Sequence, residues 1–303
     1  MKTLSLTQQT EYHFATGLLE STHPDMTARI KKAIFGLAGM LLHDDLEISM
    51  PRFEAIELET ANLASHNDEE ETLAQQCKGY LGLLNRFNNY VGQGIEELIG
   101  TQLNSALKSS WTTDPNLEFV RNAVQFPDLY LVDRQHKRFL LSIEIKSWFV
   151  FAIDDITARF EAAPNLIRDD SLLVLFPWCM TKLISGTPKL LEPYIGNARA
   201  LAQRRDNIWL AGGVREFNQG NVSAARRIEL PPTAEAALNK TKTKSVAYQL
   251  KGTVFEKESD NFGKIWRIYD SQINTIFYPK TLQNQVLGKS IAQWRNQLGI
   301  DKK

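Results

Sequence analysis

Two short segments of alternating apolar and polar residues, 128–133 and 138–146, constrain the fold more than any other part of the chain. In the second segment the odd-numbered positions are apolar and the even-numbered ones are polar, apart from Leu140. Alternation with a period of two is typical of a β-strand with one buried face. The polar residues 134–137 between the segments predict a turn, so 128–146 is expected to form a hairpin.

The rest of the chain alternates between helical and extended patterns, which favours a mixed α/β (α+β) fold with a central mixed sheet flanked by helices. We expect a helical region over 1–92, a core over 93–215 and a basic loop with a helical end over 216–303, in one compact domain. Within these regions the patterns predict helices over 26–42, 66–87, 94–108, 151–163 and 189–205 and from 233 onward, strands over 117–124, 172–176 and 208–211, and a loop or arm over 215–245.

The charges are balanced in number but not in position. The chain has 35 basic and 35 acidic residues, yet 1–150 holds 13 basic and 20 acidic ones and 151–303 holds 22 basic and 15 acidic ones. With 43% hydrophobic residues it is not a disordered chain. The basic half indicates a polyanionic partner, the alternative being that the charges simply fall unevenly.

Several classes of protein find no support in the sequence. We find no secretory signal and no apolar run long enough to cross a membrane, so a cytoplasmic protein without a membrane partner is expected. Cys77 and Cys179 are too few for a disulfide framework and are expected to be buried thiols. The five histidines show no metal-ligand spacing, and no serine-hydrolase, P-loop or zinc-protease motif occurs.

The hairpin carries the residues with the clearest chemistry. Glu144 and Lys146 are two apart on one strand, so their side chains share a face, and pairing of the strands would bring Asp128 beside Glu144. Two neighbouring carboxylates suit Mg²⁺, with the backbone carbonyl of Ile145 as a third ligand. Lys146 would act on an attacking water or balance the charge of a phosphodiester transition state. The alternative is that Glu144 and Lys146 form a pair exposed to solvent.

The pattern Pro127-Asp128 followed by Glu144-Ile145-Lys146 resembles the motif of the PD-(D/E)xK nuclease superfamily, and the layout of residues 95–215 is similar to that of a type II restriction endonuclease. The resemblance implies a mixed sheet flanked by helices, with Asp128 and Glu144 as Mg²⁺ ligands and Lys146 as a catalytic residue. It also implies an acidic residue from a preceding helix. Glu97 is the preferred candidate, and Glu96 and Glu118 remain open.

The same resemblance implies a DNA partner. We expect a Mg²⁺-dependent endonuclease that cuts double-stranded DNA at a specific sequence, works as a homodimer and is paired with a DNA methyltransferase. A nuclease of DNA repair, junction resolution or transposition, or a non-catalytic DNA-binding protein, remains an alternative. Polar and basic side chains that could contact phosphate, each with a solvated surface role as its alternative, are Ser147, Lys182, Arg199, Arg204, Arg205, Arg226 and Arg227.

Overall fold

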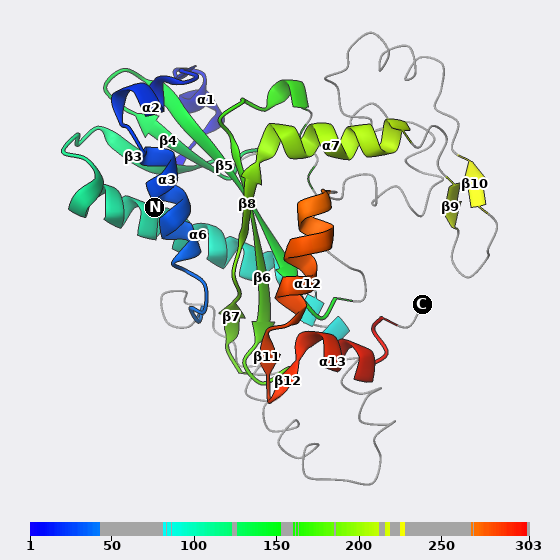
Figure 1. Cartoon of the computed structure of the whole chain (residues 1–303). Helices are drawn as coiled ribbons and strands as arrows, with labels where there is room; N and C mark the ends of the chain where they lie inside the picture. The colour runs from blue at the N-terminus through cyan, green and yellow to red at the C-terminus, as the bar shows by residue number, and fades with distance from the viewer. Residues whose placement is uncertain are drawn as a thin grey trace.

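The computed structural model describes residues 1–42, 81–82, 84–85, 87–122, 126–152, 160, 162, 164–184, 186–211, 216–218, 225–227, 268 and 270–301. Within these ranges the chain forms a curled mixed sheet flanked by helices (Figure 1). The expected α/β class is therefore confirmed. None of the described helices is both long and apolar enough to cross a membrane.

The described elements fall into three parts along the chain. The first part comprises β1 (Thr3–Leu4), α1 (Leu6–Gln9), β2 (His13–Phe14), α2 (Leu18–Thr22), α3 (Met26–Phe35) and α6 (Asn88–Ala106), which continues as a π-helical turn (Leu107–Trp111). The middle comprises β3 (Leu117–Asn122), β4 (Leu129–Asp133), β5 (Arg138–Phe149), a 3-10 turn (Pro164–Leu166), β6 (Leu172–Met180), β7 (Pro188–Leu190), β8 (Tyr194–Asn197) and α7 (Ala198–Ala211). The last part comprises β9 (Glu216–Asn218), β10 (Ala225–Arg227), a π-helical turn (Ile273–Phe277), α12 (Tyr278–Leu282), β11 (Gln285–Val286), β12 (Lys289–Ser290) and α13 (Ile291–Gln297).

The main sheet has the order β1-β3-β4-β5-β6-β7, with β2 beside the start of β5 and β8 beside the start of β6. Strand β4 runs antiparallel to both β3 and β5, whereas β1 pairs in parallel with β3 and β6 pairs in parallel with β5. The predicted hairpin over 128–146 is confirmed by the pairing of β4 with β5. Its open end, away from the turn, lies where β5 continues beyond β4.

A β-bulge at Leu140 interrupts the hairpin. Val132 pairs with Phe139 and Leu131 pairs with Leu141, so Leu140 is an extra residue on β5. Phe139 consequently belongs to a small cluster with Tyr130, on the face opposite Leu141. The prediction of one odd-numbered apolar face is therefore wrong at Phe139, and the Leu140 interruption in the sequence pattern marks the bulge.

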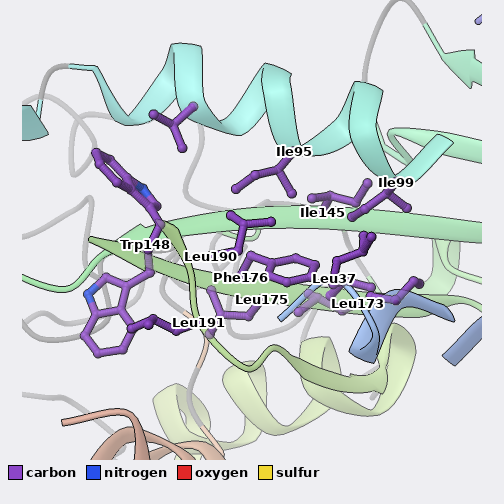
Figure 2. Packing of buried hydrophobic residues seen from close by; sticks show 14 of the residues in the cluster. Leu37, Ile95, Ile99, Ile145, Trp148, Leu173, Leu175, Phe176, Leu190 and Leu191 are labelled. Carbon is purple, nitrogen blue, oxygen red and sulfur yellow. The ribbon is translucent and has the colours of Figure 1, made fainter. Parts of the chain in front are cut away.

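Helix α6 covers the face of the hairpin that carries Leu141. Its apolar residues recur every four positions, and Figure 2 shows Ile95 and Ile99 pointing toward Ile145 of β5. The side-chain amide of Asn104 donates to the carbonyl of Phe119 and accepts from its N–H, both at 2.8 Å. These two bonds fix α6 along β3 and so set where each α6 side chain lies.

Strand β6 lies between β5 on one side and β7 and β8 on the other. All nine of its residues are buried, because α6 lies on one side of the strands and α7 on the other (Figure 2). Such a continuous apolar run is typical of a strand covered on both faces. The prediction of a strand from 172 is confirmed, and the strand extends to Met180.

Two predictions for the following segment are wrong. The helix expected over 189–205 begins only at Ala198, because residues 188–190 and 194–197 form β7 and β8, both paired with β6. The expected strand over 208–211 is the last turn of α7. The short apolar segments are equally compatible with helix and strand in isolation, and pairing with β6 decides between them.

The remaining predictions have mixed outcomes. The helix over 94–108 is confirmed, whereas the one over 26–42 ends at Phe35. Of the C-terminal core candidates, Ile273 and Phe277 are buried. Cys179 is buried as expected. Most of the helices predicted over 66–87 and 151–163, most of the arm over 215–245, and Cys77, Trp266 and Tyr269 lie outside the described residues.

Candidate functional site

Asp128 lies at the open end of the hairpin, directly before β4. The last pair of the β4–β5 ladder joins Leu129 and Ile143, and beyond it Asp128 Oδ2 accepts a hydrogen bond of 2.6 Å from the backbone N–H of Ile145. In an antiparallel ladder the N–H and C=O of one residue point to the same side. The carbonyl of Ile145 therefore points to the side where Asp128 lies.

Glu144 and Lys146 lie on β5 next to this end, on the same face of the strand. Glu144 Oε1 lies 2.5 Å from Lys146 Nζ, and the side chains are 7% and 24% exposed. The alternative of a solvent-facing pair therefore does not hold for Glu144. Glu144 Oε2 is buried and has no hydrogen-bond partner in the described part of the chain. A buried carboxylate oxygen without a partner is costly for the fold.

A second pair, Glu96 of α6 and Arg121 of β3, lies beside Asp128. Arg121 Nη2 donates to Glu96 Oε2 at 2.7 Å. Asn122, which follows Arg121, donates its backbone N–H to the carbonyl of Asp128. Arg121 was missed from the sequence, although it is the only cation of the predicted strand 117–124 and lies seven residues before Asp128.

The electrostatics of these residues show that they form one cluster, which we call the open-end cluster: Glu96, Arg121, Asp128, Glu144 and Lys146. Burial raises the pKa of Glu144 to about 7, with Asp128 adding to the rise and Lys146 opposing it. Burial also raises the pKa of Asp128, against the opposing effect of Lys146. The pKa of Glu96 is raised by burial and by Asp128. Burial acts to lower the pKa of Lys146, but the negative charges of Glu144 and Asp128 outweigh burial, so the pKa of Lys146 is raised.

The open-end cluster has more negative than positive groups. With every group ionised, its three carboxylates exceed its two cations by one charge, and burial is the largest cause of the raised pKa of each carboxyl. A bound cation would remove the excess and provide a partner for Glu144 Oε2. The cluster is thus a candidate cation site with perturbed acids, the combination expected of a functional site.

Mg²⁺ fits these donors. Across the described ranges, no group of three or more His, Cys, Asp or Glu side chains has a metal-binding arrangement. Mg²⁺ needs no such group, because one or two carboxylates and several waters commonly hold it. Asp128, the unpartnered oxygen of Glu144 and the carbonyl of Ile145 are donors of that kind.

The structure does not bring Glu97 or Glu118 into the open-end cluster. Glu97 Oε1 lies 3.2 Å from the amino group of Met1. Glu118 pairs with Arg134 and Lys2, toward the turn end of the hairpin. The acid that α6 contributes next to Asp128 is Glu96, one residue before the preferred candidate, because successive side chains on a helix point about 100° apart.

The basic residues expected to contact DNA are engaged within the protein where the structure describes their side chains. Arg199 pairs with Asp169, and Arg204 pairs with Asp270. Arg205 is fully buried and donates to the carbonyls of Phe160 and Ala162, so placing it on a basic surface was wrong.

The structure shows less about the three remaining basic candidates, Lys182, Arg226 and Arg227. Lys182 is exposed in the loop after β6. Arg226 and Arg227 belong to β10, which pairs with β9, and their side chains lie outside the described residues.

Ser147 lies on the α6 side of β5. Its hydroxyl donates to the carbonyl of Asn88 at 3.1 Å, and Gly92 lies so close that a Cβ there would be 3.1 Å from the hydroxyl oxygen. Its hydroxyl thus joins β5 to the first turns of α6. Trp148 is buried, as expected, and stacks against Tyr278 at a ring-centroid distance of 5.3 Å.

Comparisons of the chain with protein-family models, curated proteins and solved structures found no match. The geometry of the open-end cluster is therefore the basis for any assignment of function.

Proposed function

We propose that this chain is a Mg²⁺-dependent endodeoxyribonuclease of the PD-(D/E)xK superfamily, acting as a type II restriction endonuclease on double-stranded DNA. One observation carries the proposal. Asp128, Glu144 and Lys146 meet at the open end of the hairpin, where a buried oxygen of Glu144 has no partner among the described residues.

The order of the elements supports the same proposal. Helix α6 precedes the antiparallel strands β3, β4 and β5, and β6 then runs parallel to β5. The acids and the lysine lie on the hairpin in the middle of this sheet. That arrangement agrees with the core implied by the sequence resemblance, a mixed sheet flanked by helices with the site on a central hairpin.

Each residue has a distinct role in the proposed reaction. Asp128 and Glu144, with the carbonyl of Ile145, would hold Mg²⁺, and Glu96 would hold Arg121 beside them. Bound Mg²⁺ supplies a Lewis acid and activates water for attack on phosphorus. The ammonium of Lys146 lies on the face of Glu144, where it can stabilise the negative charge that develops on the phosphate.

The test is digestion of phage DNA by the purified protein in the presence of Mg²⁺. The proposal expects discrete fragments from the wild type and none from Asp128→Ala or Lys146→Ala. Arg134→Gln, at the turn end, is the matched control and is expected to cut. Absence of fragments with the wild type, or equal cutting by all four proteins, would contradict the proposal.

The same assay separates the related functions. Cutting confined to branched or nicked DNA would replace restriction by repair, junction resolution or transposition. DNA binding that is insensitive to Mg²⁺, without strand breakage, would indicate a non-catalytic DNA-binding protein. A DNA methyltransferase gene beside this one supports restriction, and sedimentation of the protein at several concentrations tests the proposed homodimer.

A further inference from the structure

Arg121 is the cation of the open-end cluster to which the proposed reaction assigns no contact with the substrate. Its side chain is 33% exposed, compared with 24% for Lys146, 17% for Glu96 and 7% for Glu144. In the described part of the chain, the hydrogen bond to Glu96 is the only one its guanidinium makes. A guanidinium has five N–H donors, so most of its donors remain for another acceptor.

The charge of Arg121 acts on Asp128, one of the proposed metal ligands, and on Glu96. Burial raises the pKa of both Asp128 and Glu96, and Arg121 acts to lower both. Lys146, the second cation, has its ammonium 2.5 Å from Glu144. A phosphodiester approaching this end would therefore meet three carboxylates, and Arg121 is the cation placed at their exposed edge.

We propose that Arg121 binds the phosphate group of the nucleic-acid strand at the open-end cluster, with Glu96 holding the guanidinium in position. This inference rests on the proposed function. The planar guanidinium matches two oxygens of a phosphate and can bind them in a bidentate manner, which the point charge of a lysine does not reproduce. Glu96 occupies one side of the guanidinium and leaves the other donors for the phosphate.

The protein contains a matched control for this residue. Arg134 pairs with Glu118 as Arg121 pairs with Glu96, and its exposure of 36% is close to the 33% of Arg121. Both glutamates are 17% exposed. Arg134 lies at the turn end of the hairpin, so a purely structural arginine–glutamate pair should behave alike at both places.

The experiment compares Arg121→Gln, Arg121→Lys and Arg134→Gln with the wild-type full chain. Single-turnover cleavage is measured with Mg²⁺, and binding of a fluorescein-labelled duplex is measured with Ca²⁺ at several salt concentrations. We expect Arg121→Gln to slow cleavage about 100-fold and to reduce the slope of log affinity against log salt by about 1. Arg121→Lys should keep the slope but recover only part of the rate, and Arg134→Gln should match the wild type.

The outcomes separate this inference from the proposed function. If the wild type cuts and Arg121→Gln matches Arg134→Gln in rate and slope, the inference is overturned and the proposed function stands. If the wild type binds duplex but does not cut, the proposed function fails and the salt slope alone decides the inference. If the wild type does not bind duplex, both fail. Circular dichroism of each variant, together with Arg121→Lys, distinguishes loss of phosphate binding from loss of folding.

Discussion

At the turn end of the β4–β5 hairpin, Asp133 accepts a hydrogen bond from the backbone N–H of His136 and contacts its ring, and Glu118 pairs with Arg134. At the open end, Glu144 has one lysine contact and one oxygen without a described partner. Burial acts to raise the pKa of a carboxyl at both ends. The contacts of His136 outweigh it and lower the pKa of Asp133, whereas the pKa of Glu144 is raised to about 7.

The contrast separates two uses of the same residue types. Where acids have hydrogen-bond donors and cations as partners, the charges contribute to the fold. Where buried acids outnumber their cations, the fold is destabilised, and such an arrangement points to a ligand or a reaction. Counting acids and bases along the sequence does not distinguish the two ends, since both have glutamate, aspartate, arginine and a nearby lysine or histidine.

The largest expected difference between the ends is in catalysis. Glu144→Gln should slow Mg²⁺-dependent DNA cleavage about 1000-fold, because it removes a charged metal ligand. Glu118→Gln, an equivalent change at the turn end, should leave the rate within about twofold. Single-turnover cleavage assays measure both, and equal rates for the two variants would break the comparison.

Next in size is the dependence of stability on pH. The pKa of Glu144 in the folded chain, about 7, lies above its ordinary value of 4.5. Between these values the folded state binds more protons than the unfolded state, so stability falls as pH rises through this range. Without divalent ions, the free energy of unfolding should decrease by up to about 3 kcal/mol between pH 4.5 and pH 7 from this group. Urea titrations of the wild type and Glu144→Gln measure it, and an unchanged slope in the variant would count against the raised pKa.

A slightly smaller effect is expected from Mg²⁺ itself. An ion that binds only the folded chain stabilises it by about 2.7 kcal/mol at a concentration one hundred times its Kd. Thermal unfolding with Mg²⁺ or with EDTA should show this stabilisation in the wild type and in Asp133→Asn, but not in Asp128→Asn. The same melting shift in all three proteins would place the ion elsewhere.

The smallest expected effect concerns the turn end. Asp133→Asn should reduce the free energy of unfolding by about 1 kcal/mol, because a neutral amide makes weaker hydrogen bonds to His136 than a carboxylate does. Glu144→Gln at neutral pH without metal should change it in the opposite direction. Urea unfolding midpoints of the two variants measure both changes. If both variants changed the free energy of unfolding in the same direction, the contrast between a stabilising acid at the turn end and a destabilising acid at the open end would be wrong.

The sequence predicts the hairpin and α6 because both have long, regular periodicities that their packing preserves. Strands β7 and β8 could not be predicted, since each is short and is defined by its pairing with β6. The burial of Arg205 depends on the carbonyls of Phe160 and Ala162, more than forty residues away in the chain.

Within the candidate site, the hairpin residues could be placed from their spacing alone. The choice between Glu96 and Glu97 could not, because it depends on the rotation of α6 about its axis. The bonds between Asn104 and Phe119 help to set that rotation, and the sequence gives no signal for them. Arg121 was missed because a single cation in a strand has no pattern of its own.

Asp128 has a further consequence for how the protein behaves in a test tube. Its carboxylate accepts the N–H of Ile145 just beyond the last pair of the β4–β5 ladder, so a side chain takes the place of a neighbouring strand there. Ile145 is buried, so its N–H would be an unsatisfied donor without this acceptor, which destabilises the fold. Replacement by alanine removes this acceptor along with the charge, whereas asparagine keeps an acceptor oxygen. An inactive protein intended for crystals with DNA is therefore better made as Asp128→Asn.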